Sequence, residues 1–385
     1  MARAMGARLE GRMTDPEVVV IGSGPAGACA AITAAQAGAR VMIVERAALP
    51  RPKVCGCCLS DAGVAGLEAI GARDVLHEAV PIDAVRLATG TREASLPRTG
   101  GVALSREALD ARLAAHARSY GVFVLERTSA RVHADGTVTL ASDPAAPLRP
   151  ACTVVADGLG GASLVDIPGF QWRIEPRSRM GFGAMLPAGA VDCVRGEIRM
   201  HVAHAGYVGA VRLEDGSIDV AAAVRPEALR AAGGPAACAR AWLGHAVLDP
   251  GALDAARWRG TPALTRRRAC LAAPRILVTG DAAGYVEPFT GEGMGWAIAT
   301  GAAAGRLAAA MRSAPDAWRA WPSQHRALVR VQRLRCRAIA LTLRSPLLVT
   351  GAIACARAAP RALGAAAHAV GRRPSHAPRP AGAAA

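Results

Sequence analysis

The 385-residue sequence predicts an α/β fold: a domain built on a mixed or parallel sheet, an antiparallel β-sheet domain inserted into it, and C-terminal helices. Three observations predict this fold. A buried strand near the N-terminus runs directly into a glycine-rich turn, a second buried strand ends on Asp281, and strand-length apolar runs recur at regular spacing between the two. A chain of this length suits one composite domain or two.

Composition narrows the possible functions. Apolar residues make up 52% of the chain, aromatic residues only 3%, and the formal net charge is +16. Such a charge can attract nucleic acid, a membrane surface or an acidic substrate. Nucleic acid is disfavoured because the sequence has no nucleic-acid-binding motif and few aromatic rings that could stack on bases.

The N-terminal segment 1–17 contains no apolar run of the kind that signal peptides carry. We therefore expect a cytoplasmic protein. In that reducing compartment the ten cysteines are expected to form no structural disulfides. Several stand in alanine-rich settings, where they resemble small buried apolar residues.

Residues 17–46 have the pattern of a strand, a tight turn, a helix and a second strand. The β-branched run 18–21 is typical of a strand buried on both faces. The turn and the helix start match G-x-G-x-x-G and consist of Gly22, Gly24, Pro25, Ala26 and Gly27. In this Rossmann-like pattern the first glycine allows the turn, the second admits a pyrophosphate, and the third lets the helix pack on the sheet. Free N–H groups and the positive dipole end of the helix complete a predicted nucleotide site.

The second strand of this unit, 41–44, ends at Glu45, which is followed by Arg46 and stands 23 residues after Gly22. An acidic residue at that distance can accept hydrogen bonds from an adenosine ribose. The acid strengthens the prediction of a dinucleotide site. The fingerprint alone does not separate FAD from NAD.

A second motif far along the chain favours FAD. The strand 276–279 ends at Gly280-Asp281, where a carboxylate can accept a hydrogen bond from a hydroxyl of a bound polyol. The loop that follows leads into a helix predicted over 294–310, and it contains Pro288, Gly291, Glu292, Gly293 and Met294. The start of that helix can stabilise the negative charge of a reduced flavin.

Between these motifs lies a helix with Ser105 as its N-cap and Gly121 just past its end. Arg106 lies in its first turn, where the helix dipole gives no reason for a cation. A hairpin with an Asp135-Gly136 turn is expected next. It is followed by a strand that ends on Asp157-Gly158.

The glycine fingerprint, the Asp157-Gly158 motif, and the Gly280-Asp281 motif followed by P-x-x-G-x-G resemble the flavoprotein monooxygenase superfamily over residues 15–325. Within it, RPKVCGCCLS together with GDAAGYVEPFTGEGM resembles the geranylgeranyl reductase-like branch, which also contains hydroxylases and has halogenases as relatives. The resemblance implies an FAD-dependent oxidoreductase. Because only one dinucleotide fingerprint is present, NAD(P)H or another reductant is expected as a transient electron donor.

The resemblance also implies roles for single residues. Glu45 would bind the adenosine ribose, Arg106 would lie on the pyrophosphate side of FAD, and Asp281 would bind the ribityl–pyrophosphate region. Residues 291–294 would face the isoalloxazine. The Asp157-Gly158 motif departs from the commoner spacing of the superfamily, because four residues, 159–162, precede Ser163.

The stretch KVCGCCLS contains Lys53, the only lysine in the chain, and three cysteines within four residues. No metal site is predicted, because this spacing does not match C-x₂₋₄-C and no second ligand pair follows. In the resembled branch K-x-C-G recurs. This implies a loop across the flavin edge, with Lys53, Cys55 and Gly56 as catalytic residues. Cys57 and Cys58 are then incidental, although Cys55 and Cys58 have the C-x-x-C spacing of a redox disulfide.

The region 166–269 is expected to form an antiparallel sheet whose inner face shapes a substrate cavity against the flavin. Its predicted strands are 181–186, 194–202, 207–213 and 217–224, with a further hairpin from 85–96. The residues expected to point inward are Ala210, Val211, Val220 and Ala222, which favours a hydrophobic small-molecule substrate. Candidate polar contacts are Tyr207, His201 and His204.

These patterns divide the chain into an FAD-binding domain (15–80, 100–165 and 270–325), a substrate-binding domain (81–99 and 166–269), a C-terminal helical region (326–372) and a disordered tail (373–385). The helical region is rich in arginine. Its apolar residues recur at helical spacing. It is interpreted as a cap on the core or as an interfacial helix that contacts anionic lipid, which would place the protein at the inner face of a membrane.

The sequence therefore predicts an FAD-dependent oxidoreductase acting on a hydrophobic small molecule, either by hydroxylating an aromatic or polyketide-like substrate or by reducing isoprenoid double bonds. One alternative is a halogenase-like enzyme, since 170–176 faintly matches the halogenase W-x-W-x-I-P signature. Another is a non-catalytic flavin-binding scaffold at a membrane surface. Oligomeric state is not predicted.

Overall fold

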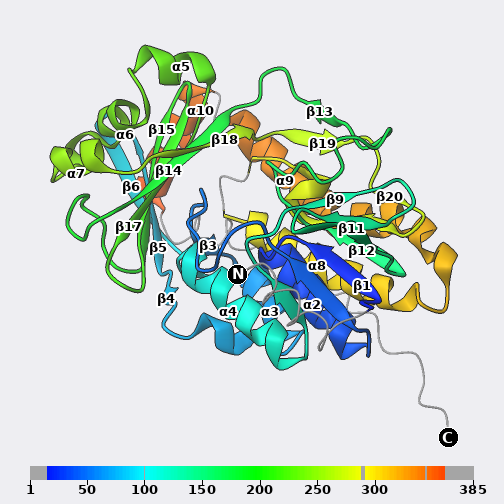
Figure 1. The fold of residues 1–385 in the computed structure, drawn as a ribbon. Helices are drawn as coiled ribbons and strands as arrows, with labels where there is room; N and C mark the ends of the chain where they lie inside the picture. The colour runs from blue at the N-terminus through cyan, green and yellow to red at the C-terminus, as the bar shows by residue number, and fades with distance from the viewer. Residues whose placement is uncertain (1–14, 99, 288–290, 343–344, 360–385) are drawn as a thin grey trace, which may run out of the picture.

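The computed structural model describes residues 15–98, 100–287, 291–342 and 345–359, and it has the predicted α/β architecture. Figure 1 shows two lobes: one holds a six-stranded sheet with long helices, and the other holds a seven-stranded sheet with short helices beside it. Pro288 and the expected disordered tail 373–385 lie outside the described residues.

The six-stranded sheet is parallel apart from one edge strand. Its strands, in the order in which they lie side by side, are β20 (Ala272–Ala273), β21 (Ile276–Val278), β12 (Cys152–Val155), β1 (Val18–Ile21), β2 (Val41–Val44) and β8 (Phe123–Leu125). All residues of β1, β2 and β12 are buried. Their unbroken apolar sequences follow from this burial, because a parallel sheet is covered on both faces. Only β20 runs antiparallel to its neighbour.

Helices of this lobe are α2 (Pro25–Gln36), α3 (Asp61–Glu68), α4 (Arg106–Ser119) and α8 (Gly293–Ala310). Ser105 caps α4 as predicted, since its side chain accepts a hydrogen bond from the Ala108 N–H at 3.1 Å. Gly121 follows the helix with a φ of 78°.

The backbones of α2 and α8 touch each other. A Cβ atom on Gly301 would lie 2.1 Å from the carbonyl oxygen of Ala26, and one on Gly305 would lie 2.0 Å from that of Ala30. Real Cβ atoms do not approach other atoms this closely. Glycine at both positions therefore allows the two helices to meet at a distance that any side chain would prevent.

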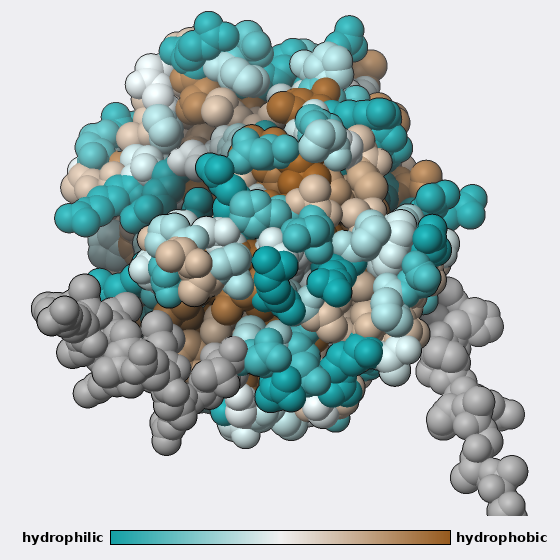
Figure 2. Space-filling view, turned by 45° about the vertical axis from the view of Figure 1, so that its right-hand side comes forward, coloured by the Kyte–Doolittle hydropathy of each residue, from teal (hydrophilic) through white to brown (hydrophobic). Residues whose placement is uncertain are grey.

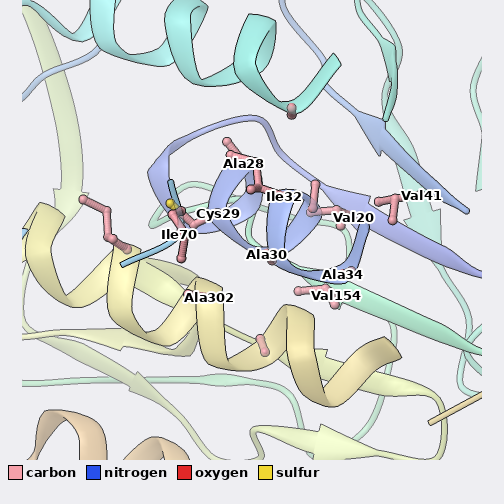
Figure 3. Close-up of a cluster of buried hydrophobic side chains, with 14 of the residues drawn as sticks. Val20, Ala28, Cys29, Ala30, Ile32, Ala34, Val41, Ile70, Val154 and Ala302 are labelled. Atoms are coloured by element: carbon pink, nitrogen blue, oxygen red, sulfur yellow. The ribbon is translucent and has the colours of Figure 1, made fainter. Parts of the chain in front are cut away.

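Small side chains fill the space around this contact. Figure 3 shows Ala30 and Ala34 of α2, Ala302 of α8 and the strand residue Val154, which belong to one buried hydrophobic cluster. The Thr33 hydroxyl donates a hydrogen bond to the Ala302 carbonyl at 3.0 Å and so joins the two helices directly.

Three small sheets lie around the main one. The hairpin predicted at Asp135-Gly136 is present and belongs to a three-stranded sheet. The small sheets consist of β9 (Ala130–Val132), β10 (Val138–Leu140) and β11 (Asp143–Leu148); of β3 (Cys58–Leu59), β7 (Val102–Ala103) and β4 (Val80–Pro81); and of β13 (Trp172–Ile174), β19 (Arg266–Arg268) and β22 (Gly284–Tyr285).

The seven-stranded sheet forms the second lobe. Its strands, in spatial order, are β18 (Arg259–Ala263), β14 (Met180–Leu186), β17 (Ile218–Val224), β16 (Gly206–Arg212), β15 (Glu197–Ala203), β5 (Ala84–Thr89) and β6 (Arg92–Pro97). The predicted hairpin near residues 85–96 is part of it. The expectation of a wholly antiparallel sheet is wrong at one pairing, since β5 runs parallel to β15. These two strands are far apart in the chain, so no tight turn imposes an antiparallel pairing.

The outer face of this sheet is covered by short helices, so both faces are buried. The helices are α5 (Pro226–Ala231), α6 (Pro235–Leu243) and α7 (Pro250–Ala255). Three of the four residues predicted to point into the cavity, Ala210, Val220 and Ala222, pack instead on this outer side. Only Val211 lies in the cluster on the opposite side. The prediction failed because apolar side chains occupy both faces, and alternation alone does not say which face is which.

The C-terminal helices connect the two lobes. Helix α9 (Trp321–Thr342) packs on α8, and α10 (Pro346–Ala358) packs on β6 and β5 (Figure 1). Val349 and Ile353 of α10 belong to the hydrophobic cluster on the cavity side of the seven-stranded sheet. Among the described helices, none is by itself long and apolar enough to cross a membrane. One pair, 315–342 with 347–358, bent by 101°, passes the same test of length and composition.

Substituting alanine for Gly301 or Gly305 should destabilise the protein by about 1–3 kcal/mol, because the new methyl group would overlap a backbone carbonyl of α2. Urea unfolding of the purified protein measures this. Gly351 in α10 is a matched control, because a Cβ atom there meets nothing within 4 Å. Its alanine variant should gain about 0.5–1 kcal/mol from helix propensity. Equal stability of the Gly301 and Gly351 variants would contradict the proposed contact.

Candidate active site

The three glycine motifs meet at the carboxyl ends of the parallel strands. A Cβ atom on Gly22, whose φ is 99°, would lie 2.6 Å from the Ala156 carbonyl, next to Asp157. Gly280 has a φ of 61°, and its Cβ position lies 2.6 Å from the Ala26 side chain. Open α/β sheets bind ligands at this edge.

A cradle for an anion lies at the start of α2. Gly24 is the N-cap, and the first turn of the helix contains no acidic residue, so its N–H groups are available for phosphate. A Cβ atom on Gly24 would lie 3.7 Å from a guanidinium nitrogen of Arg106 and 4.0 Å from one of Arg51. A side chain here would fill the space between two cations and the helix start.

Both cations are held in place by one buried carboxylate. Arg106 donates two hydrogen bonds to Asp110, at 3.0 and 2.9 Å, and Arg51 lies 3.5 Å from the same group. Bidentate pairing fixes the orientation of Arg106. This explains a cation in the first turn of α4. Arg51 was not predicted.

Glu45 is buried at the end of β2. It accepts hydrogen bonds from the Ser23 N–H at 2.9 Å, the Ala47 N–H at 3.0 Å and Arg51 at 3.2 Å. Burial opposes ionisation, but the Arg51 charge and the two N–H donors outweigh it and hold the pKa of Glu45 below its ordinary value. A carboxylate has about four acceptor sites, so it can still accept from a ribose hydroxyl. The neighbouring Arg46 is exposed.

Lys53 and Asp281 lie close enough for their charges to interact. The Lys53 ammonium lies 3.2 Å from the Cβ position of Gly158, so the K-x-C-G segment reaches the Asp-Gly motif. Burial and the charge of Arg106 lower the pKa of Lys53, against the attraction of Asp281. Burial likewise raises the pKa of Asp281, against Lys53 and Arg106. The structure therefore brings Lys53, Gly158, Arg106 and Asp281 together.

Other predicted residues have mainly structural contacts. Asp157 accepts hydrogen bonds from the Ser163 hydroxyl at 2.6 Å and the Ser163 N–H at 3.1 Å, which accounts for the unusual spacing of this motif. The Met294 side chain is in the core cluster beneath α8. Gly291 has a φ of 73° and lies against Cys58, where a Cβ atom would come within 3.3 Å of the Cys58 carbonyl.

Cys55 has the environment of a reactive thiol. A hydrogen bond with the Cys57 thiol lowers the pKa of Cys55 to about 6, against burial and with help from the Arg106 charge. The same hydrogen bond, with burial, raises the pKa of Cys57 well above its ordinary value. Burial raises the pKa of Cys58. All three cysteines are thiols rather than disulfides.

A cavity of about 480 Å³ lies between this segment and the seven-stranded sheet. Small or apolar residues form much of its wall, among them Val54, Gly183, Ala184, Ala252 and Ala255. Charged and polar residues also line it, namely Lys53, Cys57, Arg106, Glu107, Asp219, Arg257 and Arg259. In the space-filling view of Figure 2, hydrophobic side chains are recessed between hydrophilic ones.

Asp219 of β17 was missed by sequence reasoning. It is 5% exposed and lines the cavity, although its neighbours Ile218 and Val220 point to the outer face. A signal was present, because an acidic residue in the middle of the apolar run SIDVAAAV is out of place on a strand with two buried faces.

The residues predicted as polar contacts of the substrate lie on different faces of the seven-stranded sheet. Tyr207 lies in the cluster on the cavity side. His201 packs near His245 on the other side, where burial lowers its pKa to about 4, and His204 is exposed. The halogenase-like segment forms β13, in which Trp172 stacks on Arg266 and Arg268 at 5.0 and 4.3 Å. Within the described residues no group of three or more His, Cys, Asp or Glu is placed to bind a metal.

Comparison with known proteins agrees with this geometry. Residues 15–179 match the model of the FAD binding domain. The menaquinone reductase of Mycolicibacterium smegmatis is 27% identical over 373 residues, covering 89% of this chain and 88% of the relative. The digeranylgeranylglycerophospholipid reductase of Methanoculleus marisnigri is 27% identical over 330 residues, covering 78% of each.

Solved structures show the same fold. A geranylgeranyl bacteriochlorophyll reductase-like protein from Thermoplasma acidophilum has a TM-score of 0.71 at 18% identity, over 88% of this chain and 90% of that one. A flavin-dependent brominase has a TM-score of 0.76 at 17% identity, over 92% and 94%. The match of residues 15–179 to the FAD binding domain, together with the open space at Gly24 and the paired cations, identifies FAD as the cofactor.

Replacing Asp281 by alanine should weaken FAD binding about 10- to 100-fold, the loss expected when a charged hydrogen-bonding group is removed. Flavin content of the purified protein and titration of the apoprotein with FAD measure this. Asp254→Ala is the control, because Asp254 is exposed and forms an ion pair with Arg240 at the surface. Unchanged flavin affinity in the Asp281 variant would contradict its assignment to the cofactor.

Proposed function

We propose that this chain, which is an FAD-dependent oxidoreductase, reduces carbon–carbon double bonds in the isoprenoid chain of a lipid-like substrate. The observation that carries the proposal is the wall of the cavity. Among the residues that the structure describes, its apolar part consists of glycine, alanine, valine, methionine and proline, without an aromatic ring. Such a wall suits a flexible aliphatic chain better than a flat ring held by stacking.

The relatives support the same choice. The two relatives described above, which align with most of this chain, are named for the reduction of menaquinone and of a digeranylgeranyl lipid. Isoprenoid units are common to both kinds of molecule. Likeness to the brominase extends to the fold alone, at 17% identity.

Bound FAD would supply hydride, after reduction by NAD(P)H or another transient donor. The chain itself would bind and orient the cofactor. Arg106, Arg51 and the start of α2 would hold the pyrophosphate, and Glu45 would hold the adenosine ribose. The segment around Lys53 and Cys55, which we propose to be catalytic together with Gly56, lies at the cavity, where Lys53 and Arg106 both form part of the wall.

We further propose that α9 and α10 contact the inner, anionic face of a membrane. Five of the ten large hydrophobic residues that are exposed in the described structure lie on these two helices. They are Val331, Leu334, Leu341, Leu347 and Leu348, with 45, 57, 63, 85 and 56% exposure. Exposed arginines lie among them at Arg326, Arg330, Arg337 and Arg357. Leucines flanked by arginines are typical of a helix that lies in an anionic interface.

Helix α10 lies between the proposed membrane-contacting residues and the seven-stranded sheet. Its buried side, with Val349 and Ile353, packs into the cluster that contains Met200 and Tyr207 on the cavity side of the sheet. Its other side exposes Leu347 and Leu348. A lipid that leaves the membrane at α10 would therefore contact the lobe of the seven-stranded sheet directly.

The reductase proposal is tested with dithionite-reduced protein and menaquinone in detergent, without oxygen. After extraction and reoxidation of the quinone ring in air, we expect a product with two more hydrogen atoms than menaquinone for each isoprenoid double bond reduced, detected by mass spectrometry. Ala255→Trp should lower the rate at least tenfold, because Ala255 lines the cavity. Ala231→Trp is its control on an exposed position of α5. A product that instead gains oxygen, and only in air, would show a hydroxylase.

Membrane contact is tested by sedimentation with vesicles. The protein should bind phosphatidylglycerol vesicles more tightly than phosphatidylcholine vesicles, and salt should weaken the binding. Changing both Leu347 and Leu348 to serine should lower the affinity at least tenfold, since each exposed leucine would lose apolar contact. Leu248→Ser, at an equally exposed leucine outside α9 and α10, should have no effect. Equal binding of the two variants would contradict the proposal.

A further inference from the structure

The carboxyl group of Asp219 is placed to act on whatever occupies the cavity. It comes from β17, in the floor of the substrate lobe, and lines the cavity together with Lys53 and Cys57. One of its oxygens, Oδ2, is buried and has no hydrogen-bond partner among the described residues. A buried polar atom without a partner costs free energy, so a function for it at this position is expected.

A row of polar side chains connects Asp219 to the lobe of the six-stranded sheet. Cys57 lies close enough to both Cys55 and Asp219 to lower the pKa of either one by hydrogen bonding, and its single S–H can donate to one of them at a time. Arg106 in turn lies close enough to Cys55 to lower its pKa. This row of side chains therefore runs from Arg106, which we propose to bind pyrophosphate, to the seven-stranded sheet. Its members come from three separate parts of the sequence.

The backbone conformation of Cys57 is unusual for a residue other than glycine. Cys57 has a φ of 49°, a left-handed conformation that costs a non-glycine residue about 1–3 kcal/mol. It is also 2% exposed. Such a conformation persists only where surrounding contacts fix it. Here Cys57 lines the cavity together with Asp219 of β17.

We infer that Asp219 is the acid that gives its proton to the substrate during double-bond reduction, and that Cys57 is the residue that positions it. This inference rests on the reductase function proposed above. Reduction of a double bond adds one hydride and one proton. The hydride comes from the cofactor, and the proton needs a donor that reaches the same cavity.

The environment of Asp219 favours its protonated form. Burial raises its pKa well above the ordinary value, and the charge of Cys55 raises it further, against the hydrogen bond from Cys57. A carboxyl group kept neutral at neutral pH can act as a general acid. Glu107 is the other carboxyl group on the cavity wall, and it also faces Asp219.

The step balances in atoms and electrons. The O–H bond of Asp219 breaks, and the π electron pair of the alkene forms a C–H bond with that proton at the less substituted carbon. The more substituted carbon, which tolerates electron deficiency better, receives the hydride with its electron pair. Asp219 is left as a carboxylate, and it recovers a proton from water. No further oxidant or reductant is needed.

The first experiment needs no substrate. Infrared spectra of the FAD-loaded protein at neutral pH should contain the carbonyl band of a protonated carboxyl group, and Asp219→Asn should remove it. Cys57→Ala should shift the band to higher frequency, because a hydrogen bond to the carboxyl group is lost. Asp254→Asn should leave it unchanged. A wild-type spectrum without a band that depends on Asp219 would overturn the inference.

The second experiment measures single-turnover reduction of menaquinone by dithionite-reduced protein. Asp219→Asn should lower the rate by about 10²–10⁴-fold, the usual contribution of a general acid. Flavin content and the KM for menaquinone should stay close to wild type. Asp219→Glu should recover part of the rate, and Cys57→Ala should lower it less than Asp219→Asn does.

The outcomes of the two experiments separate the proposals. Full activity of Asp219→Asn would overturn the role of Asp219, and a simultaneous loss in Glu107→Gln would move that role to Glu107. Failure of the wild-type protein to reduce menaquinone would count against the reductase function. The infrared result would then still decide whether Asp219 is a protonated acid held by Cys57.

Discussion

The backbone contact between α2 and α8 is the constraint on which the rest of the site depends. Gly301 and Gly305 bring α8 against the carbonyl groups of Ala26 and Ala30, and Gly280 lies against the Ala26 side chain at the same end. The starts of both helices and the end of β21 are therefore held at one edge of the sheet. Helix starts attract negative charge. One contact thus sets the distance between the region where we place the pyrophosphate and the region where we expect the flavin.

Much of this edge could be predicted from the sequence, because it depends on local backbone rules. A glycine that must adopt a positive φ, a carboxylate at a strand end and a capping serine each leave a mark within a few residues. Gly22, Glu45 and Ser105 are examples, and the structure places each where the pattern indicates. Arg106 could be found because a cation is out of place at a helix start.

The seven-stranded sheet was harder to predict, because elements far away in the sequence decide which face of its strands lines the cavity. Val220 and Ala222 were expected to face the cavity but pack under α6 and α7. The sheet is buried on both faces, so its apolar residues do not identify the cavity side. Asp219, the polar residue between them, identifies it better. Arg51 gave no signal, since arginine supplies all but one of the 46 basic residues.

The contact between α2 and α8 also has a consequence for the order in which the protein can be made. Thr33 and Ala302, which join the two helices, are 269 residues apart in the chain. During synthesis the first strand and helix leave the ribosome long before their partners β21 and α8 exist. Domains generally fold as units during translation. Here β1 and α2 keep apolar faces exposed until β21 and α8 have been synthesised. We therefore expect the nascent chain to need protection from aggregation until most of its length has been translated.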